Sequence, residues 1–427
     1  MVTNTDCMTI TTKRSSFVDR FNSNRRRSAQ IFDMVSPTAY LSRPIPLRHP
    51  IRFYEGHIPA FSFITLAKDA LGVAPIDDRL ELLFYRGIDP ASAKEAQESA
   101  PEMWPDRAEV QALASRWDAA VLDILSKADA DPSLLKPHVK EAINAILEHE
   151  PMHHETLLYM LHRVALADKL RPAGFALPQP GGSPPVPQRI QIPAGRATIG
   201  ALPERVEFGW DNEFRELDVN VPAFEIDKYS VTQEQYLDFV EQAGGESPSS
   251  WIRRGGVWMR RTMFSEIPLP PAWPVYVSLK QAKAYADWRG GRLMTEPEFH
   301  RAAFGTPEGY ERTHPWGNAS PSSEHGNFGF ERFDPTVVGT YPAGASAWGI
   351  EDLVGNGWEW TSTVFGPLLG FKRMKSYPGY SADFFDGAHF VLKGASPTTA
   401  CELIRRSLRN WYRADYPYVY AKFRLVR

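Results

Sequence analysis

Cysteine is nearly absent from this sequence, and so are long hydrophobic runs and any excess of charge of one sign. Cys7 and Cys401 are too few for a disulfide scaffold or a zinc-thiolate site, and such usage fits a reducing cytoplasm. No apolar run approaches the length of about 20 residues that crosses a bilayer. Lysine and arginine number 48 against 51 aspartates and glutamates, a net charge of −3. The sequence therefore predicts a cytoplasmic protein with no nucleic-acid partner and no membrane partner.

A segment rich in proline and glycine divides the chain. Residues 171–188, RPAGFALPQPGGSPPVPQ, cannot sustain a helix or a central strand, and we interpret them as a linker. Upstream, residues 17–170 carry apolar residues at helical spacing. Four stretches have this spacing: about 17–35, about 57–71, 106–128 and about 138–166. In 106–128 the apolar stripe consists of Val110, Leu113, Trp117, Val121 and Ile124. Four helices that each carry one apolar stripe must bury those stripes against one another, so this domain is predicted to be a four-helix bundle.

Residues 189–427 form a second predicted domain of different character. Ten of the 12 tryptophans lie beyond residue 188, among short strands and many turns. Thr295 followed three positions later by Glu298 is a capping pair that predicts the start of a helix. Trp358 and Trp360, in GNGWEWT, are interpreted as core anchors. The pattern predicts an α+β domain with much irregular backbone, and hence a multidomain chain.

The string HEPMHHETL, residues 149–157, contains a literal H-E-x-x-H, the ligand pattern of zinc proteases. His149 and His153 are four residues apart, so in a helix they share one face and can hold one ion. Pro151 lies between them and removes a backbone donor, and it tends to kink the helix where a zinc protease needs Glu150 as general base. A hydrolytic zinc site is therefore disfavoured.

A third ligand has to come from elsewhere in the bundle, and the candidates are His49, His57 and His138. His57 is expected to face inward near the start of its helix. Three neutral imidazoles leave coordination positions open for substrate or dioxygen. The ligand type by itself does not separate iron from zinc.

These residues resemble a known family. Gly56 and His57 in RFYEGHIPAF, followed by His149, His153 and Glu155, resemble the DinB-like bundle of the nonheme-iron sulfoxide synthases of ergothioneine biosynthesis. The selenium-using selenoneine synthases are relatives of these enzymes. In the second half, matching strings resemble the formylglycine-generating-enzyme-like domain (sulfatase-modifying-factor, C-type-lectin-like) that the family pairs with the bundle. These strings are IPAGRATIG, FGWDNEF, VPAFEIDKYSVTQEQYLDFV, GRLMTEPEFHRAAFG, GNGWEWT, VLKGAS and FRLV.

The resemblance implies an enzyme with Fe(2+) on His57, His149 and His153, at the junction of the two domains. Its implied reaction uses O2 to bond sulfur or selenium to imidazole C2 of hercynine, the trimethylated betaine of histidine. The implied partners are small molecules: hercynine, O2, and a cysteine-type thiol or a selenosugar as donor. The resemblance also implies a tyrosine that donates a proton, and Tyr377 and Tyr380 are the candidates.

The resemblance further implies the substrate contacts. Asn410 is expected to face the hercynine imidazole, with Trp411 and Tyr412 in the same segment, where aromatic faces suit a trimethylammonium group. Met152 stands where ergothioneine enzymes often have a glutamine that bonds the imidazole. Tyr412 and Tyr416 replace an Asp and an Arg that bind γ-glutamylcysteine in some members. That donor is disfavoured because its buried charges would lack partners, and the softer pocket favours cysteine or, slightly more, a selenosugar.

Two other functions stay open on the sequence. One is a zinc-dependent hydrolase or thiol transferase of the DinB-like class, and the other is a non-catalytic ligand-binding protein. A formylglycine-generating activity needs a pair of reactive cysteines, and Cys401 is the one cysteine of the second domain. The sequence does not decide between selenium and sulfur, between the two tyrosines, or among oligomeric states.

Overall fold

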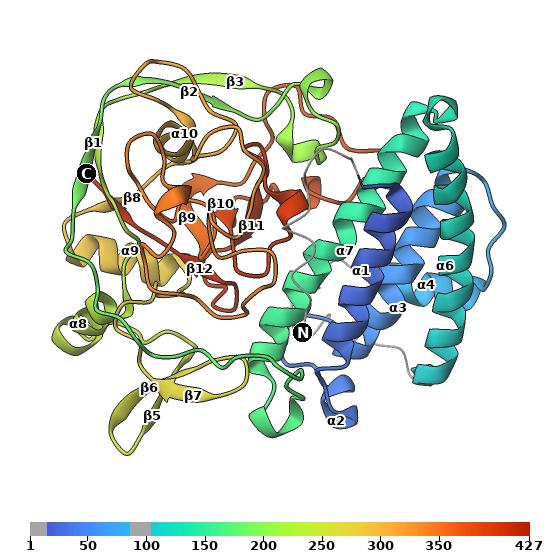
Figure 1. Cartoon of the computed structure of the whole chain (residues 1–427), viewed down its shortest axis with the longest axis horizontal. Coiled ribbons are helices and arrows are strands. Elements are labelled where there is room, and N and C mark those ends of the chain that lie inside the picture. The colour runs from blue at the N-terminus through green and yellow to red at the C-terminus, as the bar shows by residue number, and fades with distance from the viewer. Residues whose placement is uncertain (1–14, 86–103) are drawn as a thin grey trace. The chain divides into compact units, whose positions relative to one another are not determined.

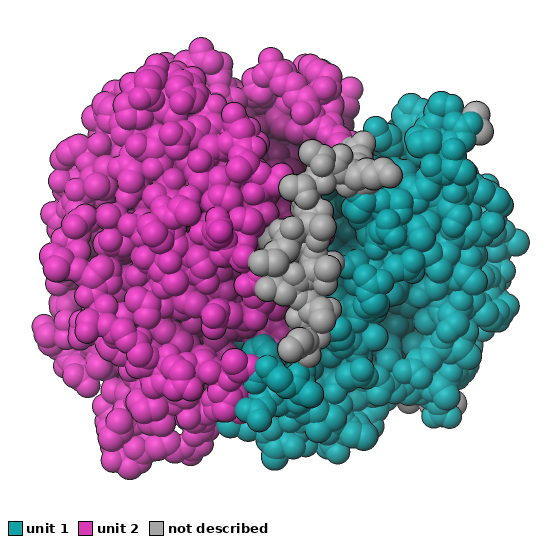
Figure 2. Space-filling view, viewed as in Figure 1, with its two compact units in different colours: residues 1–2, 11–175, 374–379 teal, residues 3–10, 176–373, 380–427 magenta. Residues whose placement is uncertain are grey.

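The structure, a computed structural model, describes residues 15–85 and 104–427 (Figure 1). The chain forms two compact units, which Figure 2 distinguishes by colour. In the described part, unit 1 comprises residues up to 175 together with 374–379, and unit 2 comprises 176–373 and 380–427. Cys7 lies outside the described residues.

Unit 1 is helical. Its elements are α1 (Phe17–Phe32), α2 (Pro37–Tyr40), α3 (Ile51–Ser62), the π-helix η1 (Phe63–Ala70), α4 (Asp78–Tyr85), α6 (Arg107–Ala130), η2 (Pro132–Leu134), α7 (Pro137–Arg163) and η3 (Leu166–Asp168). Helix α3 packs on α6 and α7, and α1 packs on both α6 and α7, as Figure 1 shows. The predicted helical bundle is thereby confirmed.

Helix α6 buries the apolar stripe that its spacing predicts, with one difference. Its buried residues are Val110, Leu113, Trp117, Val121, Leu125 and Ala128. Ile124, expected in the stripe, is only partly buried, because the next inward position four residues after Val121 is Leu125. Trp117 is fully buried and stacks on Phe63 of η1, with 6.5 Å between ring centroids.

One predicted helix start in the bundle was wrong. Helix α3 begins at Ile51, after an extended Pro50, and not near residue 57, so His57 lies well inside it. Helix α7 runs without interruption through Pro151. A proline leaves the carbonyl four residues earlier without its helical donor. Here that carbonyl, on Leu147, accepts a hydrogen bond of 3.0 Å from the buried side chain of Asn24 on α1.

In the described part of the chain, unit 2 is built from short strands with three α-helices and five short 3-10 helices among them. Its strands are β1 (Arg189–Ile192), β2 (Gly195–Ile199), β3 (Leu217–Val221), β4 (Phe224–Asp227), β5 (Trp251–Arg254), β6 (Val257–Arg261), β7 (Glu266–Pro268), β8 (Arg292–Leu293), β9 (Gly357–Val364), β10 (His389–Ala395), β11 (Asn410–Arg413), β12 (Ala421–Lys422) and β13 (Leu425–Val426). Its helices are α8 (Gln233–Ala243), α9 (Leu279–Trp288) and α10 (Glu296–Phe304). The predicted α+β architecture is confirmed.

Four sheets organise unit 2. Two have four strands each, in the orders β1-β4-β13-β8 and β11-β10-β9-β12, and the others are the β2-β3 hairpin and β5-β6-β7. In the second sheet β12 pairs in parallel with β9, while β10 is antiparallel to both β9 and β11. This sheet carries the predicted substrate segment on β11, where Asn410 pairs with Leu392.

The core of unit 2 contains the anchors that the sequence predicts. Trp358 and Trp360 on β9 are 3% and 0% exposed, and the indole of Trp360 donates to the carbonyl of Val277. Helix α10 begins after Thr295, whose side chain and that of Glu298 cap each other's backbone N–H, as predicted. Among the described residues no helix has the length and hydrophobicity needed to cross a bilayer.

A buried ionic cluster links strands that are far apart in sequence. Glu359 on β9 lies 2.6 Å from Lys422 and 3.0 Å from Arg424, and all three side chains are fully buried. Burial alone would raise the pKa of Glu359, but the two cations hold it below its usual value. The cluster therefore ties β9 to the C-terminal strands through charges that have no access to water.

Replacing Glu359 by glutamine is expected to destabilise unit 2 by about 3–5 kcal/mol, because Lys422 and Arg424 would stay buried without their counter-charge. Thermal unfolding followed by near-UV circular dichroism, dominated by the tryptophans of this unit, measures the loss. The matched control is Glu266→Gln, which breaks the exposed pair with Arg254. An equal shift of the melting temperature in both variants would contradict the prediction.

Candidate metal centre

Three histidines from two helices meet inside unit 1. His57 is on α3, and His149 and His153 are one turn apart on α7. Their Nε2 atoms are separated by 3.3 Å (His57 to His149), 3.2 Å (His57 to His153) and 3.0 Å (His149 to His153). Among the described residues this is the one group of three or more potential ligands whose donor atoms converge. The structure thus brings together the three residues that the sequence predicted as ligands.

A backbone carbonyl fixes the orientation of His57. Its Nδ1 lies 2.7 Å from the carbonyl oxygen of Phe84, at the end of α4. A carbonyl only accepts, so the imidazole donates from Nδ1, and in its neutral form the lone pair is on Nε2. The nitrogen that faces the other two histidines is therefore free to bind a cation.

Burial keeps the three imidazoles neutral. His57 and His149 are 0% and 2% exposed. Burial lowers the pKa of His57 to about 4, although the bond to Phe84 opposes the change. Burial and then the neighbouring histidines lower the pKa of His149 and His153 well below the usual value. A metal ion binds the neutral form of imidazole, so this burial keeps the three histidines in the form that a metal site requires.

The separations fit a metal ion. Zinc–imidazole bonds in proteins are about 2.1 Å long. The separations of 3.0, 3.2 and 3.3 Å are all shorter than twice that length, so one ion would be within bonding distance of all three nitrogens. Three imidazoles would leave coordination positions open for other ligands.

Aromatic rings hold the imidazoles in place. Phe53 stacks on His57 with 5.1 Å between ring centroids, and Phe61 stacks on His149 at 3.5 Å and an interplanar angle of 13°. Gly56 allows the ring of Phe84 to come close, since a Cβ at position 56 would be 2.5 Å from that ring. The residue before His57 therefore determines where the Phe84 carbonyl lies. The sequence analysis did not predict the contacts of Phe61 and Phe84 with the histidines, or why position 56 is a glycine. Phe61 could have been found, because it is four residues after His57 and shares its helix face.

The glutamate of the H-E-x-x-H string is engaged elsewhere. Glu150 forms a buried ion pair with Arg25 on α1 and accepts a bond of 2.6 Å from Ser28. Arg25 also pairs with Asp118 on α6 at 2.9 Å. Burial would raise the pKa of Glu150, but Arg25 and the bonds from His154 and Ser28 lower it to about 2. A carboxylate held this way ties three helices together and is a poor proton acceptor, so the resemblance to a zinc protease ends with the two histidines.

The two candidate tyrosines belong to different units. Tyr377 is in unit 1, where its ring is 6.0 Å from that of His149 and 5.1 Å from that of Phe61. Tyr380 is in unit 2, where it stacks on Trp210 at 4.0 Å and meets the edge of Trp411 at 5.2 Å. Of the two candidate tyrosines, Tyr377 is therefore the one that packs beside a predicted ligand within its own unit.

The predicted substrate residues of unit 2 lie along and after β11. Asn410 is half-buried, and its side-chain oxygen accepts from the backbone N–H of Trp411 at 2.8 Å. Trp411 stacks on Phe365 at 4.3 Å. Tyr412 stacks on Tyr416 at 5.0 Å and 15°. Met152, in unit 1, is half-buried on α7 directly before His153. Their substrate contacts stay predictions.

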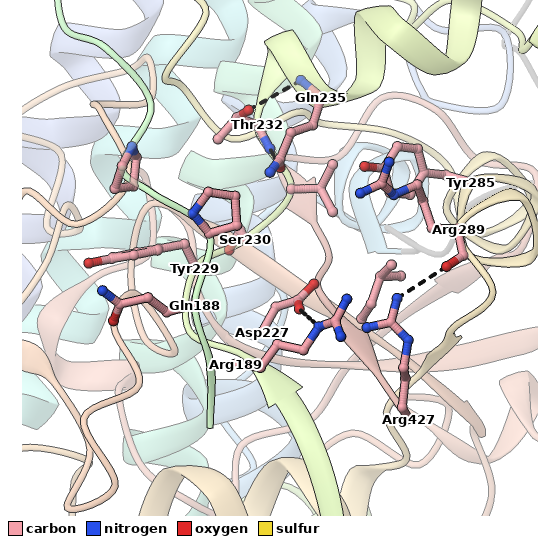
Figure 3. Close-up of a pocket in the computed structure, with 14 residues that line it drawn as sticks. Gln188, Arg189, Asp227, Tyr229, Ser230, Thr232, Gln235, Tyr285, Arg289 and Arg427 are labelled. Atoms are coloured by element: carbon pink, nitrogen blue, oxygen red, sulfur yellow. Dashed lines mark hydrogen bonds and ion pairs between the residues drawn. The ribbon is translucent and has the colours of Figure 1, made fainter. Parts of the chain in front are cut away.

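A separate cavity of about 310 Å³ lies within unit 2 (Figure 3). Arg189 pairs with Asp227 at 3.5 Å on one side of it, and Arg427 donates to the carbonyl of Arg289 on another. None of the predicted site residues lines it. The histidine cluster and this cavity are therefore different features of the molecule.

Comparisons with known proteins match the two parts of the chain to two different families. Residues 174–427 match the family described as sulfatase-modifying factor enzyme 1-like domain, and residues 20–157 match the DinB superfamily. A protein named hercynine oxygenase from Mycolicibacterium thermoresistibile is 34% identical over 321 residues, which cover 70% of this chain and 69% of that protein. Ergothioneine biosynthesis protein 1 of Schizosaccharomyces pombe is 29% identical, over 90% of this chain and 52% of its own length. The solved structure of PvdO from Pseudomonas aeruginosa covers 56% of this chain and 93% of its own at a TM-score of 0.41 and 22% identity.

Substituting Gly56 by alanine is expected to push the Phe84 ring away and weaken the Phe84–His57 bond. The overpacking should lower bundle stability by about 1–3 kcal/mol, and loss of the orienting bond should weaken metal affinity about 10- to 100-fold. Thermal unfolding and Co(II) titration followed by absorption measure the two effects. The control is Gly181→Ala, where no atom lies within 4 Å of the new methyl group. Unchanged Co(II) affinity in the Gly56 variant would show that the contact does not orient His57.

Proposed function

We propose a function for this chain from the premise that it belongs to the hercynine oxygenase family of ergothioneine biosynthesis. The proposed activity is that of an Fe(II)- and O2-dependent enzyme that acts on hercynine. It forms a carbon–sulfur or carbon–selenium bond at imidazole C2, with a cysteine-type thiol or a selenosugar as donor. With a thiol the atoms balance when thiol, hercynine and O2 give a sulfoxide and water. The proposal is supported above all by the three converging Nε2 atoms of His57, His149 and His153.

Iron accounts for the ligand set better than hydrolytic zinc does. When bound, Fe(II) supplies the redox chemistry that reduction of O2 requires, and zinc has no redox chemistry. A zinc hydrolase needs a general base beside the metal. The carboxylate that the H-E-x-x-H string offers, Glu150, is instead ion-paired with Arg25 and bonded to Ser28.

Tyr377 is the tyrosine that we propose as proton donor. Its ring packs beside His149 and Phe61, while that of Tyr380 is stacked on Trp210. A phenol at this position can donate a proton directly to a reacting group next to the ligands. Tyr380 instead supports the aromatic surroundings of Trp411.

The donor that we propose carries less charge than γ-glutamylcysteine. Tyr412 and Tyr416 stack face to face, so the segment after Asn410 and Trp411 presents aromatic faces where a charged donor would need counter-charges. Asn410 and Trp411 are proposed to contact hercynine, the indole through cation–π attraction to its trimethylammonium group. Met152, beside His153, adds a polarisable thioether, which suits a sulfur or selenium donor.

The reaction is tested by aerobic incubation of iron-loaded protein with hercynine and, separately, cysteine, γ-glutamylcysteine or a selenosugar. We expect O2 consumption only when hercynine is present together with cysteine or with the selenosugar. Mass spectrometry should identify a product in which the donor's sulfur or selenium is bonded to imidazole C2. Strong turnover with γ-glutamylcysteine would refute the donor assignment. Anaerobic activity of the zinc-loaded protein would favour a hydrolase or thiol transferase instead.

Single replacements of His57, His149 or His153 by alanine are expected to reduce bound iron from about one ion per chain to a small fraction, because two imidazoles hold Fe(II) weakly. Iron is measured by mass spectrometry of metal content after desalting. The matched control is His138→Ala, which removes an exposed histidine from the same helix, α7. Full iron content in any of the three ligand variants would exclude that residue from the site.

A further inference from the structure

The segment that carries Tyr377 is anchored to helix α7 by one carboxylate. Residues 374–379 belong to unit 1, whereas the chain on either side of them belongs to unit 2. Within this segment the backbone N–H and the hydroxyl of Ser376 both donate to the same oxygen of Glu141, at 3.2 and 2.9 Å. Met374 is buried, but Ser376 and Tyr377 are only half-buried. The two bonds to Glu141 thus attach the segment to α7 through a carboxylate.

The anchor lies at the right distance from the histidines to set the position of the neighbouring tyrosine. Glu141 precedes His149 by eight residues on α7, which is about 12 Å along the axis. Side chains on a helix lean toward its N-terminus, so His149 leans toward the turn of Glu141. Tyr377 directly follows Ser376, and its ring spans the remaining distance to contact His149 and Phe61.

We infer that Glu141 is a positioning residue, which fixes Ser376 and through it holds Tyr377 beside His149. Hydrogen bonds to a carboxylate are stronger than those between neutral groups, and the paired bonds define both the place and the direction of the Ser376 backbone. Without them the backbone of the segment at Ser376 regains conformational freedom. The catalytic consequence rests on the proposed function, but the anchoring itself does not.

Hydrogen exchange tests the anchoring without any assay of activity. In the full-length protein, Glu141→Ala is expected to speed exchange of the Ser376 amide at least about tenfold, because its acceptor is gone. Glu141→Gln keeps an acceptor oxygen and should restore most of the protection. The matched control is Asp123→Ala, which removes an exposed carboxylate from α6 and should leave the segment unchanged. Unaltered exchange in Glu141→Ala would overturn the inference.

A double-mutant cycle separates positioning from a general effect on structure. Glu141→Ala should lower kcat about tenfold, the cost of a catalytic group displaced by a fraction of an ångström, while iron content and melting temperature stay as in the parent. Combined with Tyr377→Phe, it should add no further loss, because both changes act through the same phenol. If the fold losses in kcat of the two single variants multiply in the double variant, Glu141 does not act through Tyr377. If the parent protein consumes no O2 with hercynine and donor, the proposed function fails, and hydrogen exchange alone decides the anchoring.

Discussion

The close approach of three neutral imidazole nitrogens is the constraint on which the helical unit depends. Lone pairs separated by 3.0 to 3.3 Å repel one another unless a cation or a shared proton lies between them. The structure nevertheless holds the nitrogens close: stacked phenylalanines restrain the rings of His57 and His149, and the Phe84 carbonyl determines which nitrogen of His57 faces inward. A site built this way is organised before the ion arrives, so metal binding and folding of the bundle stabilise each other.

The spacing of residues predicted much of this arrangement, and the failures have physical causes. Two histidines four residues apart on a helix identify two of the three ligands. His57 follows from its sequence context, yet the start of its helix was placed six residues too late. Gly56 looks like a helix boundary, but in the structure it is the interior position at which the Phe84 ring packs. The acceptor for His57 is a backbone carbonyl, and a backbone group has no residue type by which a sequence could reveal it.

Pro151 and Glu150 show how distant partners change the meaning of a local motif. The proline was expected to disturb the helix, but an amide from α1 satisfies the carbonyl that it leaves without a donor. The glutamate could have been a general base, but an arginine from the same α1 neutralises it. Both contacts bridge more than 120 positions of sequence. The H-E-x-x-H motif therefore specifies the face of the helix that holds two ligands, and contacts with α1 determine the roles of Glu150 and Pro151.

The helical unit is discontinuous in the chain, since residues 374–379 complete it from within the second half of the sequence. Within the described residues the polypeptide passes from one unit to the other three times, after residues 175, 373 and 379. A gene fragment ending at the linker would thus encode a bundle that lacks part of its own packing. Recombination that exchanged the second half for another domain of the same fold would keep the histidines and lose the phenol beside them. The two halves of the sequence are consequently linked through these six residues as well as through the linker that joins them.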